Sequence, residues 1–271
     1  MNCNYRKAHI VGNWKMNKTP LEAAEFVKEL REVMPKVRNY EVGLCMPAVH
    51  ISNARRAARD IRINIGAENC NANSYGDYTG EISAEMLASA GCKYVIIGHS
   101  ERRALGETDD DVNAKVKAVL NAGMIPVICV GETLRQRQNE ATLDIVAMQV
   151  KMAIADIPAN MMSGLVIAYE PIWAIGVGEA ATAEQAQTVC KCIRKIIRDK
   201  HTAAIARKVP ILYGGSMNEQ NAEAFLSHPD IDGGLIGSAS LDVEKFNKIL
   251  CIASRLNVKP EPKKRRKKTT E

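Results

Sequence analysis

Three short polar strings, far apart in the sequence, carry side chains that could act together on one small molecule. They are Asn13-Trp14-Lys15, residues 98–103 and Tyr169-Glu170-Pro171, and each follows an apolar run. If the runs are parallel strands of a barrel, their carboxyl ends share one rim. An ammonium, an imidazole and a carboxylate would then surround a common pocket, which is typical of proton transfer.

Glu170 is the candidate base, because it ends a predicted strand and Pro171 restricts the backbone that aims it. His99 precedes a predicted helical turn, where the helix dipole would keep the imidazole neutral and able to donate to a carbonyl oxygen. The alternatives are a glutamate in a salt bridge and a histidine that only satisfies local hydrogen bonds. Asn13 and Lys15 are two apart, so both could face a ligand from one side of an extended segment, although a solvated surface lysine is the alternative.

Glycines follow the sixth, seventh and eighth predicted strands, in the strings 175–178, 213–216 and 235–238. Barrel loops at these positions often offer backbone N–H groups to a phosphate. A single glycine is commonly only a turn residue, but three in adjacent loops predict a phosphate site. Residues 176–181 also fit a dinucleotide fingerprint. Nicotinamide binding is not expected, because residues 170–175 separate these glycines from the strand.

Eight short apolar runs must position these loops, and helical periodicity lies between them. The runs cover residues 9–11, 42–45, 63–66, 94–97, 126–130, 165–168, 209–213 and 234–237. Continuous apolar residues indicate strands covered on both faces. Eight strand-helix units in 271 residues predict an α/β fold, the (β/α)8 barrel. An open doubly wound sheet is the alternative, but it would leave edge strands unprotected.

The composition, with 46% hydrophobic and 25% charged residues, is that of a globular protein. The polar N-terminus resembles no signal peptide, and no run is long enough to span a membrane, so we expect a cytoplasmic protein. Scattered cysteines favour reduced thiols, and no Cys or His cluster predicts a metal site.

We predict a single barrel domain over residues 1–257 and a disordered basic tail over residues 258–271. The net charge of +6 arises from the cation run 263–268 in that tail, because the rest of the chain is neutral. A solvated extension is the interpretation we favour for the tail. Binding of nucleic acid or another polyanion is the alternative.

Five strings occur together in the order and near the spacing of one known family. They are residues 12–17, 98–103, 129–133, 168–176 and 213–216. On these strings the chain resembles the triosephosphate isomerase family over residues 8–256. The resemblance implies a TIM barrel that interconverts dihydroxyacetone phosphate and glyceraldehyde 3-phosphate through an enediolate, in glycolysis and gluconeogenesis, with no metal or cofactor.

The resemblance also implies a role for each polar residue of the strings. Glu170 would take a proton from one substrate carbon and return it to the next. Neutral His99 would donate to the substrate oxygens, a pairing already established for this family. Lys15 would supply a fixed positive charge, Asn13 a hydrogen bond, and Glu101 would be the partner of Lys15.

The family has a mobile lid after the sixth strand, which corresponds here to residues 171–181. Closing it would bring the N–H of Gly176 to the substrate phosphate and expel water from the base. The N–H groups of Ser216, Gly237 and Ser238 would complete the phosphate site.

Two departures from the family pattern concern this site. Residues 177–180 are Val-Gly-Glu-Ala where the family usually has Thr-Gly-Lys-Thr, which reverses a charge at the lid hinge. Ser238 replaces a glycine and places a hydroxymethyl group near the phosphate. We expect activity to survive both changes.

The family's third loop reaches into the other subunit of a dimer, and residues 69–81 resemble it. We therefore expect a homodimer, with Thr79 the partner of the opposite Asn13. Glu68 replaces a usual glutamine and Asp77 adds a charge, so the interface strength depends on how these carboxylates are partnered.

A second hypothesis, from a different class, is a catalytically weak barrel that acts as a polyanion-binding or scaffolding protein through residues 263–268. Intact Asn13, Lys15, His99 and Glu170 favour the isomerase.

Overall fold

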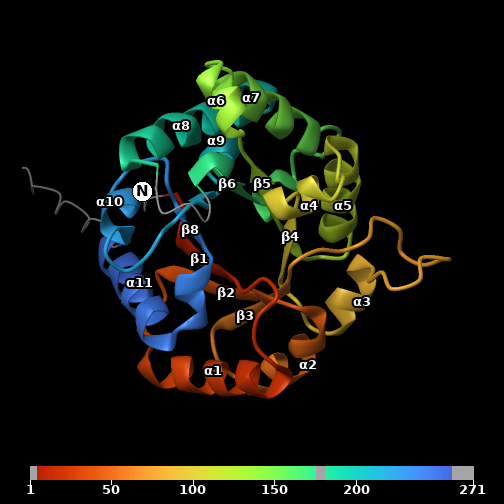
Figure 1. Ribbon diagram of the computed structural model, residues 1–271, viewed down its shortest axis with the longest axis vertical. Coiled ribbons are helices and arrows are strands. Elements are labelled where there is room, and N and C mark those ends of the chain that lie inside the picture. Colours follow the sequence, from red (N-terminus) through yellow and green to blue (C-terminus); the bar gives the residue numbers. More distant parts are fainter. Residues whose placement is uncertain (1–4, 175–180, 258–271) are drawn as a thin grey trace, which may run out of the picture.

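The computed structural model describes residues 5–174 and 181–257 of the chain. Eight strands, all paired in parallel with their neighbours, form a closed barrel in the order β1 to β8, and helices surround it (Figure 1). The predicted (β/α)8 barrel is confirmed. The predicted tail, residues 258–271, lies outside the described residues.

The strands are short, and their carboxyl ends meet at one rim. They are β1 (Ala8–Asn13), β2 (Tyr40–Met46), β3 (Ile63–Ala67), β4 (Tyr94–Ile97), β5 (Ile125–Val130), β6 (Val166–Tyr169), β7 (Ile211–Tyr213) and β8 (Gly233–Ile236).

The helices return the chain from that rim to the face where the strands begin. They are α1 (Pro20–Val33), α2 (Ala48–Ala57), α3 (Ala84–Ser89), α4 (Ser100–Ala104), α5 (Asp109–Asn121), α6 (Leu134–Gln138), α7 (Thr142–Ala153), α8 (Ala183–Lys200), α9 (Ala203–Ala206), α10 (Ala222–Leu226) and α11 (Val243–Leu256). Short 3-10 turns are η1 (Met162–Gly164), η2 (Ile172–Ala174) and η3 (Ser238–Leu241). None of the helices in the described ranges is long and apolar enough to cross a membrane.

Capping residues fix where the long helices begin. The Thr19 side chain accepts from the N–H of Glu22, and the Glu22 carboxylate accepts from the N–H of Thr19. Thr182 and Gln185 form the same reciprocal pair at the start of α8. Such pairs satisfy N–H groups that a helix leaves without partners.

Side chains fill the inside of the barrel, so it is a packed core and not a channel. The interior cluster consists of Val11, Cys45, Tyr94, Ile96, Val127, Cys129, Val166, Ala168, Leu212 and Leu235. Tyr94 is the largest of them, and Gly43 admits it, because a Cβ atom at Gly43 would lie 2.9 Å from the Tyr94 ring. A second, larger cluster fills the layer between the strands and the helices.

A buried triad of charged residues connects three segments at the face where the strands begin. Asp232 is completely buried and contacts Arg6 through Oδ1 at 2.6 Å and Arg194 of α8 through Oδ2 at 2.5 Å. Its Oδ2 also accepts from the N–H of Ile211 at 3.0 Å. One carboxylate thereby ties the N-terminal segment and a helix to the start of β7.

We expect Asp232→Ala to lower the free energy of unfolding by about 3–5 kcal/mol, because it leaves the buried Arg6 without its carboxylate and Arg194 with Asp230 alone. Urea unfolding followed by circular dichroism measures the loss. Asp199→Ala is the matched control, since Asp199 pairs with Arg198 at the surface, where about 0–1 kcal/mol is at stake. Equal losses in the two variants would contradict this role for the triad.

Candidate active site

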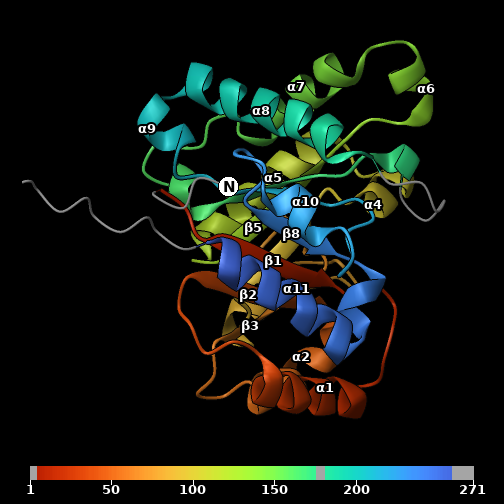
Figure 2. The same ribbon diagram turned by 90° about the vertical axis from the view of Figure 1, so that its left-hand side faces the viewer.

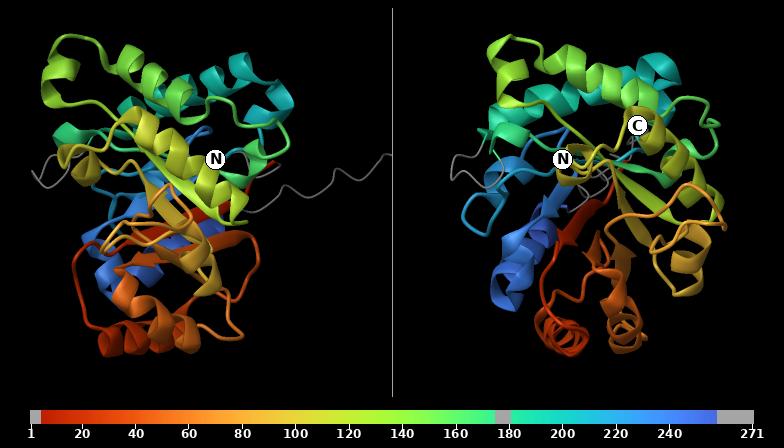
Figure 3. Two further views of the ribbon diagram at one scale, coloured as in Figure 1. Left: turned by 90° about the vertical axis from the view of Figure 1, so that its right-hand side faces the viewer. Right: turned by 45° about the vertical axis from the view of Figure 1, so that its right-hand side comes forward.

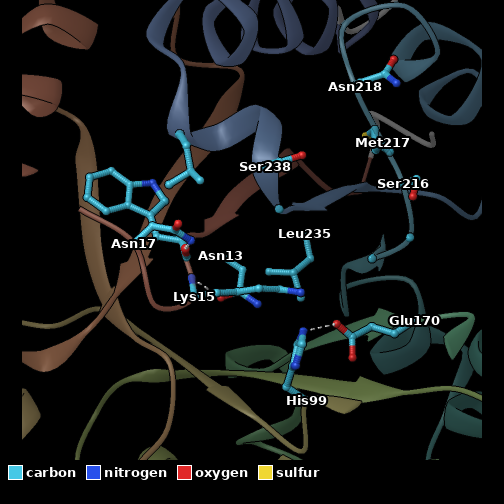
Figure 4. A pocket seen from close by; sticks show the side chains of 15 residues that line it. Asn13, Lys15, Asn17, His99, Glu170, Ser216, Met217, Asn218, Leu235 and Ser238 are labelled. Atoms are coloured by element: carbon cyan, nitrogen blue, oxygen red, sulfur yellow. Dashed lines mark hydrogen bonds and ion pairs between the residues drawn. The ribbon is translucent and has the colours of Figure 1, made fainter. Parts of the chain in front are cut away.

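A cavity of about 430 Å³ opens at the carboxyl ends of the strands (Figure 4). It is lined by Asn13, Trp14, Lys15, Asn17, His99, Glu170, Gly214, Gly215, Ser216, Met217, Asn218, Leu235, Gly237, Ser238 and Leu241. The structure thus brings together the predicted site residues from five strand ends, although Gly176 lies outside the described residues. Glu101 does not line the cavity but reaches it through Lys15.

Glu170 and His99 are in direct contact at the cavity wall. The Oε1 atom of Glu170 lies 3.0 Å from Nε2 of His99, as the dashed line in Figure 4 marks. The other carboxylate oxygen accepts from the N–H of Ser100 at 3.2 Å. Glu170 is only 2% exposed. No lysine or arginine within residues 5–174 and 181–257 pairs with Glu170, and a buried carboxylate without such a partner is well suited to accept a proton from a ligand.

Two glycines make room for Glu170. A Cβ atom at Gly131 would lie 1.7 Å from the carbonyl oxygen of Glu170, and one at Gly214 would lie 2.8 Å from its Cγ atom. Any side chain at either position would displace the carboxylate. Sequence reasoning assigned Gly214 only to phosphate binding and missed Gly131, because these contacts depend on how β5, β6 and β7 pair.

The ring of His99 is oriented by the helix that it precedes. As predicted, His99 stands before a short helical turn, and its Nδ1 atom accepts from the N–H of Glu101 at 3.2 Å. A nitrogen that accepts this bond carries no proton, so the ring proton stays on Nε2, which faces Glu170 and the cavity.

The carboxylates beside His99 oppose the neutral state expected from its position. Burial is the largest single influence and lowers the pKa of His99, but the charge and the hydrogen bond of Glu170, together with the charge of Glu101, raise this pKa above its ordinary value. Protonation would also break the bond from the Glu101 N–H. A ligand that separates His99 from Glu170 would leave burial as the main effect and favour the neutral ring.

Lys15 is held in a rare backbone conformation beside the cavity. Its φ angle is +54°, in the left-handed region, and its N–H donates to Oδ1 of Asn13 at 3.3 Å. Its ammonium lies 2.7 Å from Oε1 of Glu101, the partner expected for it. Strained residues of this kind persist only where neighbours fix them, which is common at functional sites.

Cys129 and Glu132 also support the site, and sequence reasoning did not single them out. The thiol of Cys129 lies beneath Glu170, and burial together with that carboxylate raises the thiol's pKa. Glu132 is completely buried and accepts from the Tyr169 hydroxyl at 3.1 Å and from Nε1 of Trp173 at 2.8 Å. It therefore anchors both sides of Glu170. The sequence signal was the string 129–133, which contributed to the family resemblance but assigned no role to either residue.

Glu68 lies behind the cavity, and its carboxylate has few hydrogen-bond partners. Its Oε1 atom is buried and has no hydrogen-bond partner in the described part of the protein. Burial raises the pKa of Glu68 to about 7, although a bond from the N–H of Lys15 and the nearby His99 oppose the shift. Glu68, which replaces the family's usual glutamine, is therefore a buried carboxylate that lacks sufficient hydrogen-bond partners within a single subunit.

We expect Glu68→Gln to stabilise the protein at alkaline pH. Because the folded pKa is about 7 against an ordinary 4.5, the wild type loses stability as pH rises through this window. The variant should gain about 2–3 kcal/mol at pH 8 and little at pH 4. Urea unfolding at several pH values measures this, with the exposed Glu29→Gln as control. Parallel pH profiles for wild type and Glu68→Gln would refute the assignment.

Comparisons with known proteins agree with this geometry. The family model described as "Triosephosphate isomerase" matches residues 8–253. A triosephosphate isomerase of Endomicrobium trichonymphae is 46% identical over 90% of this chain and 98% of its own length. One from Acetivibrio thermocellus is 47% identical over 90% and 97%, and one from Lactobacillus acidophilus is 46% identical over 88% and 94%. The chain belongs to the triosephosphate isomerase family.

Proposed function

We propose that the protein interconverts dihydroxyacetone phosphate and glyceraldehyde 3-phosphate by acid-base catalysis, as a cytoplasmic enzyme of glycolysis and gluconeogenesis that uses no cofactor. The observation that carries the mechanism is the 3.0 Å contact between Glu170 and His99 at the wall of a cavity that also contains Lys15. Family membership supports the reaction and does not favour the alternative of a catalytically weak scaffolding barrel.

The carboxylate of Glu170 removes a proton from the carbon beside the substrate carbonyl. The electron pair of the broken C–H bond forms the carbon-carbon double bond of an enediolate, and the carbonyl oxygen takes the negative charge. Returning the proton from Glu170 to the neighbouring carbon completes the isomerisation. The substrate displaces the Glu170 contact with His99, so each group is free to act on it.

His99 and Lys15 stabilise the charge that develops on the substrate oxygens. The proton on Nε2 of His99 points into the cavity because Nδ1 is occupied by the Glu101 N–H. The Lys15 ammonium supplies a fixed positive charge, and Asn13 a further hydrogen bond. Donors held in place before the reaction lower the barrier without reorganisation during it.

The phosphate group fits the side of the cavity where Ser216 and Ser238 lie (Figure 4). Gly237, which precedes Ser238, also lines the cavity. Their backbone N–H groups donate to no other group in residues 5–174 and 181–257. The Ser216 hydroxyl donates to the carbonyl of Ala174 at 3.1 Å, which joins this loop to η2. Gly176, outside the described residues, is proposed as a fourth donor from the lid.

We expect Glu170→Gln to lower kcat/KM for glyceraldehyde 3-phosphate by at least about 100-fold, because the amide cannot take the proton. A coupled assay of steady-state turnover measures the loss, and circular dichroism checks the fold. Glu29→Gln, a change of the same type on the exposed face of α1, should keep full activity. Wild-type turnover in Glu170→Gln would exclude Glu170 as the base.

We propose that the protein is a homodimer formed through residues 69–81. This loop leaves the barrel between β3 and α3 and extends well beyond the helices (Figures 1 and 3). Tyr75 at its tip is 86% exposed, and Met16, beside Lys15, is 94% exposed. Large apolar side chains exposed in this way are suited to a protein interface. In the proposed dimer, Thr79 of this loop contacts the partner's Asn13.

The combined change Met16→Ser and Tyr75→Ser should raise the dimer dissociation constant by about tenfold or more, since both remove interface apolar area. Sedimentation equilibrium measures the constant. Leu134→Ser removes an exposed leucine on α6, far around the barrel, and serves as control. The proposed interface is wrong if both variants associate like the wild type.

A further inference from the structure

A second cavity, of about 570 Å³, lies along the outer surface of α8 and is called the α8 cavity below. Helices α7 and α9 both pack against α8 beside it (Figure 2). Its volume is within the range of about 300–1,000 Å³ that is usual for ligand sites. It shares no residue with the candidate active site. It is lined by Leu143, Thr188, Lys191, Cys192, Arg194, Lys195, Arg198, Ala203, Ala206, Arg207 and Asp230.

Apolar side chains from three helices line the α8 cavity. Leu143 comes from α7, Cys192 from α8, and Ala203 and Ala206 from α9. Burial raises the pKa of the Cys192 thiol, so the thiol is uncharged at neutral pH and adds to this apolar surface. Leu143 is 43% exposed. A ligand with an apolar body would remove part of this surface from water, which favours binding.

Cations follow one another along the same face of α8. Lys191 and Lys195 are four residues apart and Arg198 is three further on, so all three share one face of the helix. Residues 185–198 contain no acid. Neither lysine forms an ion pair or a side-chain hydrogen bond with the residues that the structure describes. Like charges at this spacing repel each other, so an anion bound between the lysines would relieve their repulsion.

The other charged groups of the α8 cavity already have partners. Arg194 pairs with Asp230 at 2.6 Å, and Arg198 pairs with the aspartate that follows it at 3.0 Å. Arg207 lies over the Tyr5 ring, with its Cζ atom 5.4 Å from the ring centre. Asp230 is the only acid among the described residues that line the cavity, and both of its carboxylate oxygens accept hydrogen bonds. The charge left for a ligand is therefore that of the two lysines.

The stability of α8 does not account for these two lysines. Cations in the last turn of a helix interact favourably with its dipole, and Arg198 and Lys200 occupy that turn. Lys191 and Lys195 lie before the last turn, where the effect of the dipole has faded. The helix therefore carries two cations, beside an apolar cavity, that its own structure does not require.

We infer that the α8 cavity binds the anion of a medium-chain fatty acid, with its carboxylate between Lys191 and Lys195 and its hydrocarbon chain against the apolar side chains of the cavity. An ammonium is a compact point charge that suits a single carboxylate, whereas the fork of an arginine suits a phosphate better. No aromatic side chain is among the described residues that line the cavity, so an aromatic anion finds no ring to stack on. This binding is additional to the proposed isomerisation and does not depend on it.

Isothermal titration calorimetry of sodium decanoate into the full chain tests the inference. Lys191→Gln with Lys195→Gln should weaken binding by at least about tenfold, because it removes both charge-assisted contacts to the carboxylate. Leu143→Ser should weaken binding by about threefold, because it removes apolar contact area. Octanoate should bind the wild type about tenfold more weakly than decanoate, since its chain has two fewer methylenes to bury.

Lys28→Gln with Lys245→Gln is the matched control for charge, because both lysines are exposed on other helices and form no ion pair with described residues. Leu134→Ser, on the exposed surface of α6, is the matched control for apolar area. Both controls should bind decanoate like the wild type, and all four variants should keep wild-type circular dichroism and isomerase turnover.

Three results would overturn the site: no binding of decanoate to the wild type, equal weakening in the control lysine variant, or decanol binding as tightly as decanoate. The first would leave the cavity without this ligand, the second would assign binding to net charge, and the third would remove the role of the two lysines. Tighter binding of decyl phosphate than of decanoate would overturn the choice of a carboxylate.

Discussion

The structure depends on burying one carboxylate, that of Glu170, without giving it a lysine or arginine partner among the residues described. Burying such a group costs free energy, and its contacts offset only part of that cost. One N–H from Ser100, the His99 ring and the Cys129 thiol are what the protein offers it. None of the three is a permanent cation, so the carboxylate remains able to accept a proton. The rest of the rim is arranged to keep this group in place.

That arrangement relies on close packing more than on charge. Gly131 and Gly214 approach Glu170 more closely than any other residue type could, and so fix the position of Glu170 just after β6. Glu132 fixes the residues on either side of Glu170 by accepting from Tyr169 and Trp173. Because each of these contacts crosses between neighbouring strands, a shift in the register of β5, β6 or β7 would disturb the base directly.

The sequence was sufficient to predict the barrel and the residues that the cavity brings together. Apolar runs showed where strands end, and the polar residues just beyond them, such as Lys15 and His99, necessarily reach one rim. What could not be predicted depends on contacts between distant segments. The raised pKa of His99 follows from its contact with Glu170, and the roles of Gly131 and Cys129 follow from strand pairing. Local periodicity carries no information about such distances.

The two ends of the barrel have different roles, and different residues serve them. One end forms the candidate active site, and the other stabilises the fold. At the carboxyl ends of the strands, strain at Lys15 and burial at Glu170 and Glu68 are tolerated because they serve the site or lie beside it. At the opposite end, the triad of Asp232 with two arginines fixes the strands from below. Packed side chains fill the barrel between these ends and separate them. Charged residues at this end can therefore change without reaching the base, so the stability of the barrel and the chemistry of its rim can be altered separately.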